Sequence, residues 1–368
     1  MNDMNKLKFR LNKLLNIYGV SGDEYRVRKY IKKEIKDVVD SCEIDSYGNL
    51  LAVKKFGTGE GAVVLLNSHM DTVKKTEKDK IVVENDGLFV AYHAGNRSIL
   101  GADDRAGIAI ILSILDNMPK EFNGTLKLAF LREEEIGCVG SSNVDVRFYD
   151  DVDLAITFDR RGNSDIVVGT WGTPFCSTAT GNFLFDVAKK AGFDYSPTEG
   201  GVSDAMTFSS NGINSINLSV GYENEHTVNE FLVYKDFVIA YEFGLEIMKN
   251  VNRGVKMFGE VPAYSNAWIE AYVPSKYSYK SGKSKTYNDD LYDYDYGYDT
   301  ADTWNYGSDY ENKNNYYQAD PFVYTIDKEI VISDGIYEIY TDVDHVNSLI
   351  SQLENARDVL EKSLKYVK

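Results

Sequence analysis

The chain has 368 residues, with 57 acidic residues against 40 Lys and Arg, which gives a formal net charge of −17. This balance excludes a protein that binds nucleic acid or anionic lipid through clustered basic residues. An apolar share of 43% is enough for a folded core, and three scattered cysteines without CxxC spacing favour a reducing compartment over a disulfide framework. The N-terminus lacks the uninterrupted apolar segment of a secretory signal, and the apolar stretch at 106–115 is too short to span a bilayer, so we expect a cytoplasmic protein.

Short apolar runs alternate with amphipathic stretches from the start of the chain to about Arg253. Ser21 and Glu24 have the spacing of a capping box, which predicts a helix ending near Val39. Strands are predicted at 63–67, 125–131, 154–159 and 216–220, and further helices at 106–118, 174–191 and 233–249. Strands separated by helices indicate an α/β protein of three layers, αβα, in which a mostly parallel central sheet is covered by helices on both faces.

The composition changes after Arg253. Between Thr286 and Asn312 the sequence has eight acidic residues, seven tyrosines and no Lys or Arg, so we expect a poorly ordered segment that repels itself. Apolar residues then recur at spacings of three and four from Val346 to Val367, which predicts an amphipathic helix through which a homo-oligomer could form. We therefore expect a folded domain at 1–253, a Tyr- and Asp-rich segment at 254–327 and a helical C-terminal region at 328–368.

Two of the four histidines lie among acidic residues. His69 follows the predicted strand at 63–67 in the segment NSHMD, and Asp71 points to the same side of an extended chain. Asp71 is therefore placed to hold the His69 ring in one tautomer, as carboxylates do for metal-bound imidazoles. The alternative is a strand-end histidine that only meets solvent.

Two acidic clusters come next in the chain. In GADDRAG, at 101–107, Asp103 stands before an apolar helix, where it either caps the helix or bridges two metal ions. In REEEIG, the glutamates 133–135 follow the predicted strand at 125–131. Adjacent like charges repel unless a cation relieves them, so one glutamate would bind a metal while its neighbour acts as a base. A solvated loop is the alternative.

Asp159, at the end of the strand 154–159, and His226, in GYENEHTVNE, complete the series. The order His, Asp, Glu-Glu, Asp, His follows the carboxyl ends of predicted strands, the edge at which open α/β sheets form their sites. Nitrogen and oxygen ligands without a thiolate suit two Zn²⁺ ions, or Mn²⁺ or Co²⁺.

The segments SHMDTV, GADDRAG, EEEIG and EHTVNE resemble those of the co-catalytic di-zinc exopeptidases, the M20, M28 and M42 peptidases of the MH clan. The resemblance covers roughly residues 5–252 and implies the zinc exopeptidase-like phosphorylase/hydrolase fold. It implies two divalent metal ions, most readily Zn²⁺, with these ligands: His69 and Asp159 for one, Glu135 and His226 for the other, and Asp103 bridging both.

The resemblance also implies an activity. Asp71 matches the acid that orients the first histidine, and Glu134 matches the general base. The implied reaction is metal-dependent hydrolysis of peptide bonds, in small peptides or at peptide N-termini, by a metal-bound hydroxide whose proton Glu134 accepts. The family often has a cis peptide at the position of Asp103–Asp104. Only 67 positions separate Asp159 from His226, so the lid domain that M20 enzymes insert there is missing, and substrate specificity cannot be transferred.

Other interpretations stay open at this stage. The same chemistry would serve an amidohydrolase that removes the acyl group of an N-acyl amino acid. A non-enzymatic alternative makes the folded domain a scaffold whose C-terminal tail mediates assembly. Tyr195 or Tyr222 could supply a hydrogen bond to the substrate, although packing is the commoner role of such residues. Cys138 lacks a nucleophile signature, and its acidic neighbours would raise the pKa of its thiol, so we expect no thiol catalysis.

Overall fold

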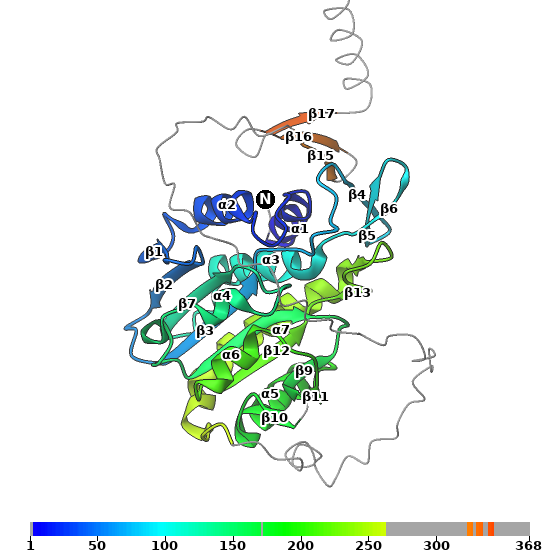
Figure 1. The fold of residues 1–368 in the computed structure, drawn as a ribbon. Coiled ribbons are helices and arrows are strands. Elements are labelled where there is room, and N and C mark those ends of the chain that lie inside the picture. Colours follow the sequence, from blue (N-terminus) through cyan, green and yellow to red (C-terminus); the bar gives the residue numbers. More distant parts are fainter. Residues whose placement is uncertain (1–2, 171, 263–321, 327–328, 334–337, 342–368) are drawn as a thin grey trace, which may run out of the picture. The chain divides into compact units, whose positions relative to one another are not determined.

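One large sheet organises the main body of the protein (Figure 1). The computed structural model describes residues 3–170 and 172–262 in full, and residues 322–326, 329–333 and 338–341 by their backbone. The strands of the large sheet are β1 (Ser41–Ile44), β2 (Leu50–Phe56), β3 (Ala62–His69), β7 (Gly124–Leu131), β8 (Leu154–Arg160), β9 (Asp165–Thr170), β10 (Thr173–Pro174), β11 (Ser196–Glu199) and β12 (Ser215–Ser219).

The strand order is β1-β2-β7-β3-β8-β12-β9-β10, with β11 paired to β9. The central strands β7, β3, β8 and β12 are parallel to their neighbours within this group, so their carboxyl ends meet at one edge. They are the four strands that the sequence predicted. All four are buried along nearly their whole length because both faces of the sheet are covered; β3 and β8 have almost continuous apolar runs, whereas β7 and β12 alternate apolar with polar residues.

Helices cover the sheet on both faces. One layer contains α1 (Asp3–Leu15), α2 (Tyr25–Ile35), α3 (Ala102–Asp116), α5 (Thr178–Ala191), α7 (Tyr234–Gly254) and the short η2 (Val255–Met257); the other contains α4 (Val139–Ser142), η1 (Val146–Phe148) and α6 (Asp204–Ser210). Val64 and Leu66 of β3 belong to the core under α3, whereas Leu65 belongs to the core on the opposite face.

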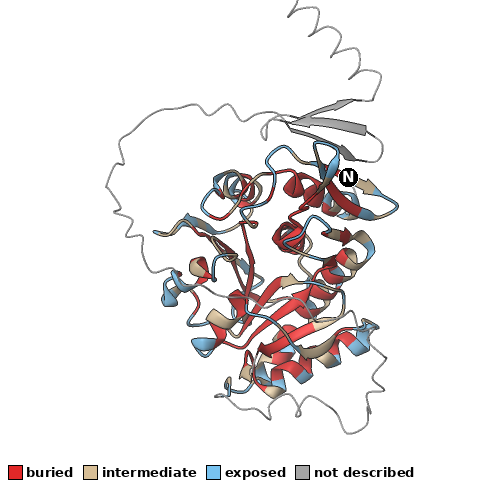
Figure 2. Cartoon of the chain, turned by 45° about the vertical axis from the view of Figure 1, so that its right-hand side comes forward, coloured by how far each residue is buried: buried red, intermediate tan, exposed pale blue. Residues whose placement is uncertain are grey.

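Figure 2 shows buried residues running through the sheet and the inner sides of the helices. This is the three-layer arrangement that the sequence predicted. Among the helices of the described ranges, none combines the length and the apolar character needed to cross a membrane.

A smaller sheet lies in the chain between β3 and α3 and is completed by residues after β12. Its strands are β4 (Ile81–Asn85), β5 (Leu88–His93), β6 (Asn96–Ser98), β13 (Tyr222–Glu223) and β14 (Phe231–Val233). The order is β13-β14-β5-β4, and β6 pairs with β5. Leu232 of β14 lies opposite Phe89 of β5, so the loop at 224–230, which carries His226, is fixed to the segment that leads into α3.

The C-terminal region differs from the prediction. Three antiparallel strands are present, β15 (Phe322–Ile326), β16 (Glu329–Ser333) and β17 (Glu338–Thr341), where the sequence analysis expected no strand. Their β-branched residues and tyrosines are typical of strands and were a usable signal in the sequence. The acidic segment at 286–312 and the expected helix at 346–367 lie outside the described residues.

Two local predictions were wrong. The α2 helix begins at Tyr25 and ends at Ile35 without a capping box, because Ser21 donates to Asp71 and Glu24 accepts from Arg132. The α5 helix begins at Thr178, capped by Ser177, rather than at Pro174, which lies in β10. In both places a tertiary contact replaces the local role: side-chain hydrogen bonds at Ser21 and Glu24, and backbone pairing with β9 at Pro174.

Candidate metal centre

The predicted ligands meet at the carboxyl edge of the parallel strands. His69 ends β3, Asp159 is the second-last residue of β8, and Glu135 follows β7. Asp103 lies in the first turn of α3, directly after the small sheet, and His226 lies in the loop between β13 and β14. Five segments that are distant in sequence therefore contribute to one site, at the edge where α/β sheets commonly bind ligands.

Two imidazoles contact the carboxylate of Asp103. Its Oδ1 lies 2.9 Å from Nε2 of His69, and its Oδ2 lies 2.9 Å from Nε2 of His226. Asp159 Oδ1 is 3.6 Å from His69 Nε2, and Glu135 Oε2 is 2.8 Å from His226 Nε2. Asp103 thus lies between two pairs, His69 with Asp159 and His226 with Glu135. This is the division that the resemblance implies, and the roles of the five residues as ligands stay a prediction.

Two overlapping groups of side chains have possible ligand atoms within 4.8 Å of one another. One is His69, Asp103 and Glu135, and the other is His69, Asp104 and Asp159. Asp104 was not predicted to bind a metal. Its carboxylate accepts from the hydroxyl of Ser68 and, at 3.0 Å, from the N–H of Gly107, so it is already bonded within the fold. The peptide bond Asp103–Asp104 is cis, as the resemblance led us to expect.

Asp71 links the first histidine to the glutamate loop. Its Oδ1 lies 3.2 Å from Nδ1 of His69 and accepts from the N–H of Glu134 at 3.1 Å. Its Oδ2 accepts from the N–H of Glu135 and, at 2.8 Å, from the hydroxyl of Ser21. Glu134 Oε2 is 4.0 Å from Nε2 of His69, so the predicted base faces the cluster.

The crowding of acidic groups changes their protonation. Burial, together with the nearby charge of Asp103, raises the pKa of Glu135 to about 7 and that of Asp159 to about 6. Burial, together with the charge of Asp159, also raises the pKa of Glu134 well above its ordinary value, although His69 opposes this. Hydrogen bonds to Asp103 and Glu135 outweigh burial at His226 and raise its pKa to about 11. Raised carboxyl pKa values in a cleft are typical of functional sites.

The side chains present fit a divalent cation. They offer imidazole nitrogens and carboxylate oxygens without a thiolate, a donor set suited to Zn²⁺, Mn²⁺ or Co²⁺. Oε1 of Glu135 is buried and has no hydrogen-bond partner among the described residues. A buried acceptor without a donor is costly, and a bound cation would satisfy it while reducing the repulsion between the carboxylates.

Residues 49–319 match the family described as peptidase family M28, and this range contains every residue of the candidate metal centre. The chain belongs to peptidase family M28. Peptidase T of Clostridium botulinum is 33% identical to this M28 chain over 115 residues, which are 30% of this chain and 28% of that relative. The chain matches less than a third of the length of its first curated relatives.

Solved structures resemble the M28 chain in fold. A tripeptidase of Staphylococcus aureus has a TM-score of 0.59 and 20% identity, over 69% of this chain and 99% of that chain. The TET1 peptidase of Pyrococcus horikoshii has a TM-score of 0.51 and 18% identity, over 66% of this chain and 99% of that chain. At these identities the likeness confirms the α/β architecture with a mostly parallel sheet.

The structure of the M28 chain also adds residues that the sequence analysis did not assign. Arg105, only 1% exposed, donates to the carbonyl oxygens of Met70 at 2.6 Å and Gly19 at 3.0 Å, and so holds the segment after β3. Tyr222 donates to Asp159 Oδ1 at 3.0 Å. An arginine directly before the apolar helix predicted at 106–118 was a usable signal for Arg105. Nothing in the sequence separated Tyr222 from Tyr195, whose hydroxyl donates to the carbonyl oxygen of Ser219.

Asp204 is a further acidic group of this site. It is the first residue of α6 and is only 1% exposed, and burial together with the charge of Asp159 raises its pKa to about 7. Both of its carboxylate oxygens are buried, and neither makes a hydrogen bond of normal length and angle to another described residue. Its charge also acts on Glu134, so Asp204 belongs to the electrostatic surroundings of the predicted base.

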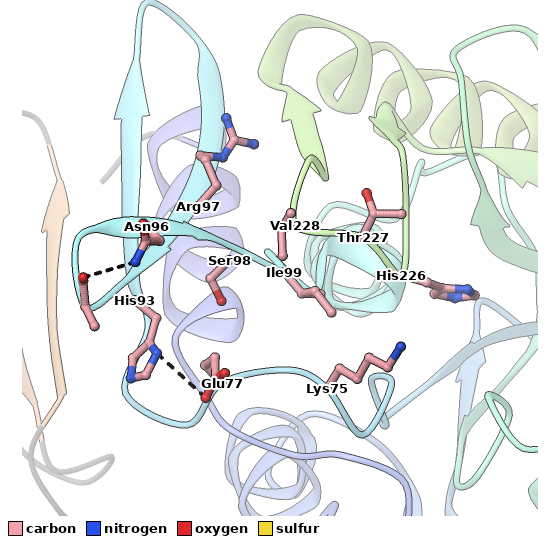
Figure 3. Close-up of a pocket in the computed structure, with 11 residues that line it drawn as sticks. Lys75, Glu77, His93, Asn96, Arg97, Ser98, Ile99, His226, Thr227 and Val228 are labelled. Atoms are coloured by element: carbon pink, nitrogen blue, oxygen red, sulfur yellow. Dashed lines mark hydrogen bonds and ion pairs between the residues drawn. The ribbon is translucent and has the colours of Figure 1, made fainter.

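A pocket of about 690 Å³ lies beside the loop of His226 (Figure 3). Its lining includes Lys75, Ile99 and Val228, and His93, which pairs with Glu77 at 3.7 Å. Cys138 contacts the predicted base, with its Sγ 3.4 Å from Oε1 of Glu134. Burial and the charges of Asp204 and Glu134 raise the pKa of its thiol, which argues against thiol catalysis as the sequence predicted.

Proposed function

We propose that this M28 chain hydrolyses peptide bonds at the N-termini of small peptides, using two divalent metal ions, with Zn²⁺ as the first candidate. The observation that carries the proposal is the position of Glu134 beside a cluster in which Asp103 contacts both histidines. Membership in peptidase family M28 supports it. In this proposal His69, Asp103 and Asp159 hold one ion, and Asp103, Glu135 and His226 hold the other.

The metal ions would supply Lewis-acid polarisation of the scissile carbonyl and of the attacking water. Glu134 accepts a proton from that water and gives it to the leaving amine, so one carboxyl group serves first as base and then as acid. Asp71 keeps Nε2 of His69 directed at Asp103 by contacting Nδ1, and it orients Glu134 through its backbone N–H. No covalent intermediate with the protein is required.

The first test is the variant Glu134→Gln, which keeps the shape of the side chain but cannot accept the proton. General bases contribute about 10²–10⁴-fold to rates, so we expect kcat to fall by at least that factor while the bound metal stays at the wild-type level. Turnover with a small-peptide amide substrate and elemental analysis of the same preparation measure both quantities.

Glu133→Gln is the matched control, because Glu133 bonds to Tyr47 and Arg132 instead of facing the cluster. It should retain most activity. Full turnover by Glu134→Gln would refute the assignment of the base.

The substrate class needs a separate test, since an N-acyl amino-acid amidohydrolase would use the same chemistry. A panel of aminoacyl amides, dipeptides, tripeptides and N-acetyl amino acids separates the two activities. We expect cleavage of substrates with a free N-terminus. Turnover confined to N-acetyl amino acids would replace the peptidase proposal with the amidohydrolase.

We also propose the organisation of the whole chain. Phe258 packs edge-on against Phe183 with ring centroids 5.6 Å apart, and the carbonyl of Gly259 accepts from Asn214, so we extend the catalytic domain predicted at 1–253 to Gly259.

Self-association through the C-terminal helix predicted within 328–368 stays part of the proposal. It is supported by the TET1 peptidase, which is described as assembling into a tetrahedron or a large octahedral shell. Light scattering on the full chain tests it, and a monomeric mass would refute it.

A further inference from the structure

Glu230 connects the two loops that carry metal-centre residues. It lies four residues after His226, directly before β14, and is 0% exposed. Its Oε2 accepts from the N–H of Gly101 at 2.7 Å, and its Oε1 accepts from the N–H of Ala102 at 2.7 Å and of Asp103 at 3.3 Å. The buried Glu230 carboxylate thus accepts from three consecutive backbone N–H groups. The last of them belongs to Asp103, whose own carboxylate lies between the two histidines.

These contacts satisfy the N–H groups of an irregular segment that leads into α3. Gly101 has φ 69°, and Asp103 and Asp104 have non-helical backbone angles, while the Asp104 carboxylate accepts from the N–H of Gly107 and caps the regular part of the helix. The N–H groups of residues 101–103 lie before that cap and need acceptors from elsewhere. Glu230 supplies the acceptor from a residue 129 positions away.

Neighbouring cations hold Glu230 in place. The ammonium of Lys80 donates to the carbonyl of Leu100 and attracts the Glu230 carboxylate. Arg97 donates from Nη2 to the carbonyl oxygen of Glu230 at 2.8 Å. The residue is therefore fixed at its backbone and at its side chain, whereas the His226 ring on the same loop is about half exposed, at 49%.

We propose that Glu230 is a positioning residue of the metal centre: by holding the backbone of residues 101–103, it fixes the Asp103 carboxylate where its two oxygens can serve two metal ions. The inference rests on the proposed function. Because Asp103 contacts both His69 and His226, a shift of its backbone disturbs both halves of the cluster together. Residues that orient metal ligands commonly change metal affinity by about 10–100-fold.

A purely structural role makes a different prediction. If Glu230 only paired the N–H groups of residues 101–103 or neutralised Lys80, its loss would lower stability without a specific effect on metal binding. The variant Glu230→Gln turns an acceptor-only group into one that places an N–H donor against the N–H groups of the loop. The double variant Glu230→Gln with Lys80→Met removes the unpaired cation as well, and it also serves if the single variant does not fold.

Asp45→Asn is a matched control. Asp45 Oδ1 likewise accepts from three consecutive N–H groups, those of Tyr47, Gly48 and Asn49, at 3.0, 2.8 and 2.9 Å. It lies in the turn between β1 and β2 and touches none of the five predicted ligands. The same carboxylate-to-amide change is thus made at a backbone turn outside the metal centre.

The experiment measures Zn²⁺ affinity of the full chain by competition with a chromophoric chelator, and the visible spectrum of the Co²⁺-loaded protein. We expect Glu230→Gln to weaken both metal sites by roughly tenfold or more and to alter the Co²⁺ spectrum. The double variant should keep the weakened Zn²⁺ affinity, and Asp45→Asn should have the affinity and the Co²⁺ spectrum of the wild type. Wild-type affinity and spectrum in Glu230→Gln, or recovery of both in the double variant, would overturn the inference alone. A wild-type protein that binds no Zn²⁺ or Co²⁺ would overturn the proposed function and this inference with it.

Discussion

Asp71 serves several parts of the site through one carboxylate. It contacts the His69 ring at 3.2 Å, the hydroxyl of Ser21 at 2.8 Å and the N–H of Glu134 at 3.1 Å. These hydrogen bonds lower its pKa although burial opposes them, so it stays charged beside the histidine. A change at Asp71 would therefore disturb both the orientation of the ring and the position of the predicted base.

The hydrogen bond from Tyr222 to Asp159 gives a testable prediction about a single residue. Its hydroxyl donates to Oδ1 of Asp159, and Tyr222→Phe removes this donor from a carboxylate that is expected to bind one metal ion. We expect the affinity of the site formed with His69 to fall by roughly tenfold, since such partners tune ligand orientation. Competition with a chelator, followed site by site, measures the change.

Tyr195→Phe is the control for that prediction. The Tyr195 hydroxyl is also buried but donates, at 2.6 Å, to the backbone carbonyl of Ser219. This variant should lose stability, by about 1 kcal/mol, and keep wild-type metal affinity. Equal losses of affinity in the two variants would show that the Tyr222 bond has no special role in metal binding.

Among the elements, the strands that carry the site were the ones that the sequence could predict. β3 and β8 have almost continuous apolar runs, and β7 and β12 alternate apolar with polar residues, so each shows one of the two patterns that are typical of strands. Short strands such as β6 and β13, of three and two residues, carry too little pattern and exist because neighbouring strands pair with them.

The same reasoning explains which site residues were found. His69, Asp103 and Glu135 lie in motifs next to predicted elements, so their order along the chain was visible. Glu230 acts through its contacts with residues 101–103, which depend on the pairing of β14 with β5. Tyr222 acts through its contact with Asp159, which depends on how the chain folds to bring β13 next to the end of β8. Local pattern has no access to such pairings.

The contact of α3 with β8 gives a prediction about these elements. A Cβ atom at Gly107 would lie 2.2 Å from the carbonyl oxygen of Phe158 and 2.6 Å from the carboxylate oxygens of Asp104. Gly107→Ala must therefore push α3 away from the sheet, and we expect a loss of about 1–3 kcal/mol in the free energy of unfolding. Urea denaturation measures it.

Gly201→Ala is the comparison, since a Cβ there has no atom within 4 Å. Its unfolding midpoint should stay close to that of the wild type. If Gly107→Ala is as stable as Gly201→Ala, the close approach of α3 to β8 is not a determinant of stability.

In the whole molecule, the titratable groups of the candidate metal centre make stability depend on pH. Without metal, the raised carboxyl pKa values of Glu135, about 7, and Asp159, about 6, mean that the folded protein binds protons there more tightly than the unfolded chain. The raised pKa of His226, about 11, acts in the same direction above its ordinary value of 6.5. Since stability falls with pH wherever the folded state holds more protons, the metal-free protein should become less stable between pH 5.5 and 8.

Bound metal reverses this trend because it takes the place of those protons. Metal ligands must be deprotonated, so affinity rises with pH over the same range, and binding to the folded state alone adds stability in proportion to the logarithm of affinity. We therefore expect the difference in Tm between Zn²⁺-loaded and chelator-treated protein to widen steadily from pH 5.5 to pH 8. Differential scanning calorimetry at constant ionic strength measures it, with Glu133→Gln as the control that should follow the wild type. A difference that stays constant over this range would show that the cluster does not exchange protons for metal ions, and would count against all five residues as ligands.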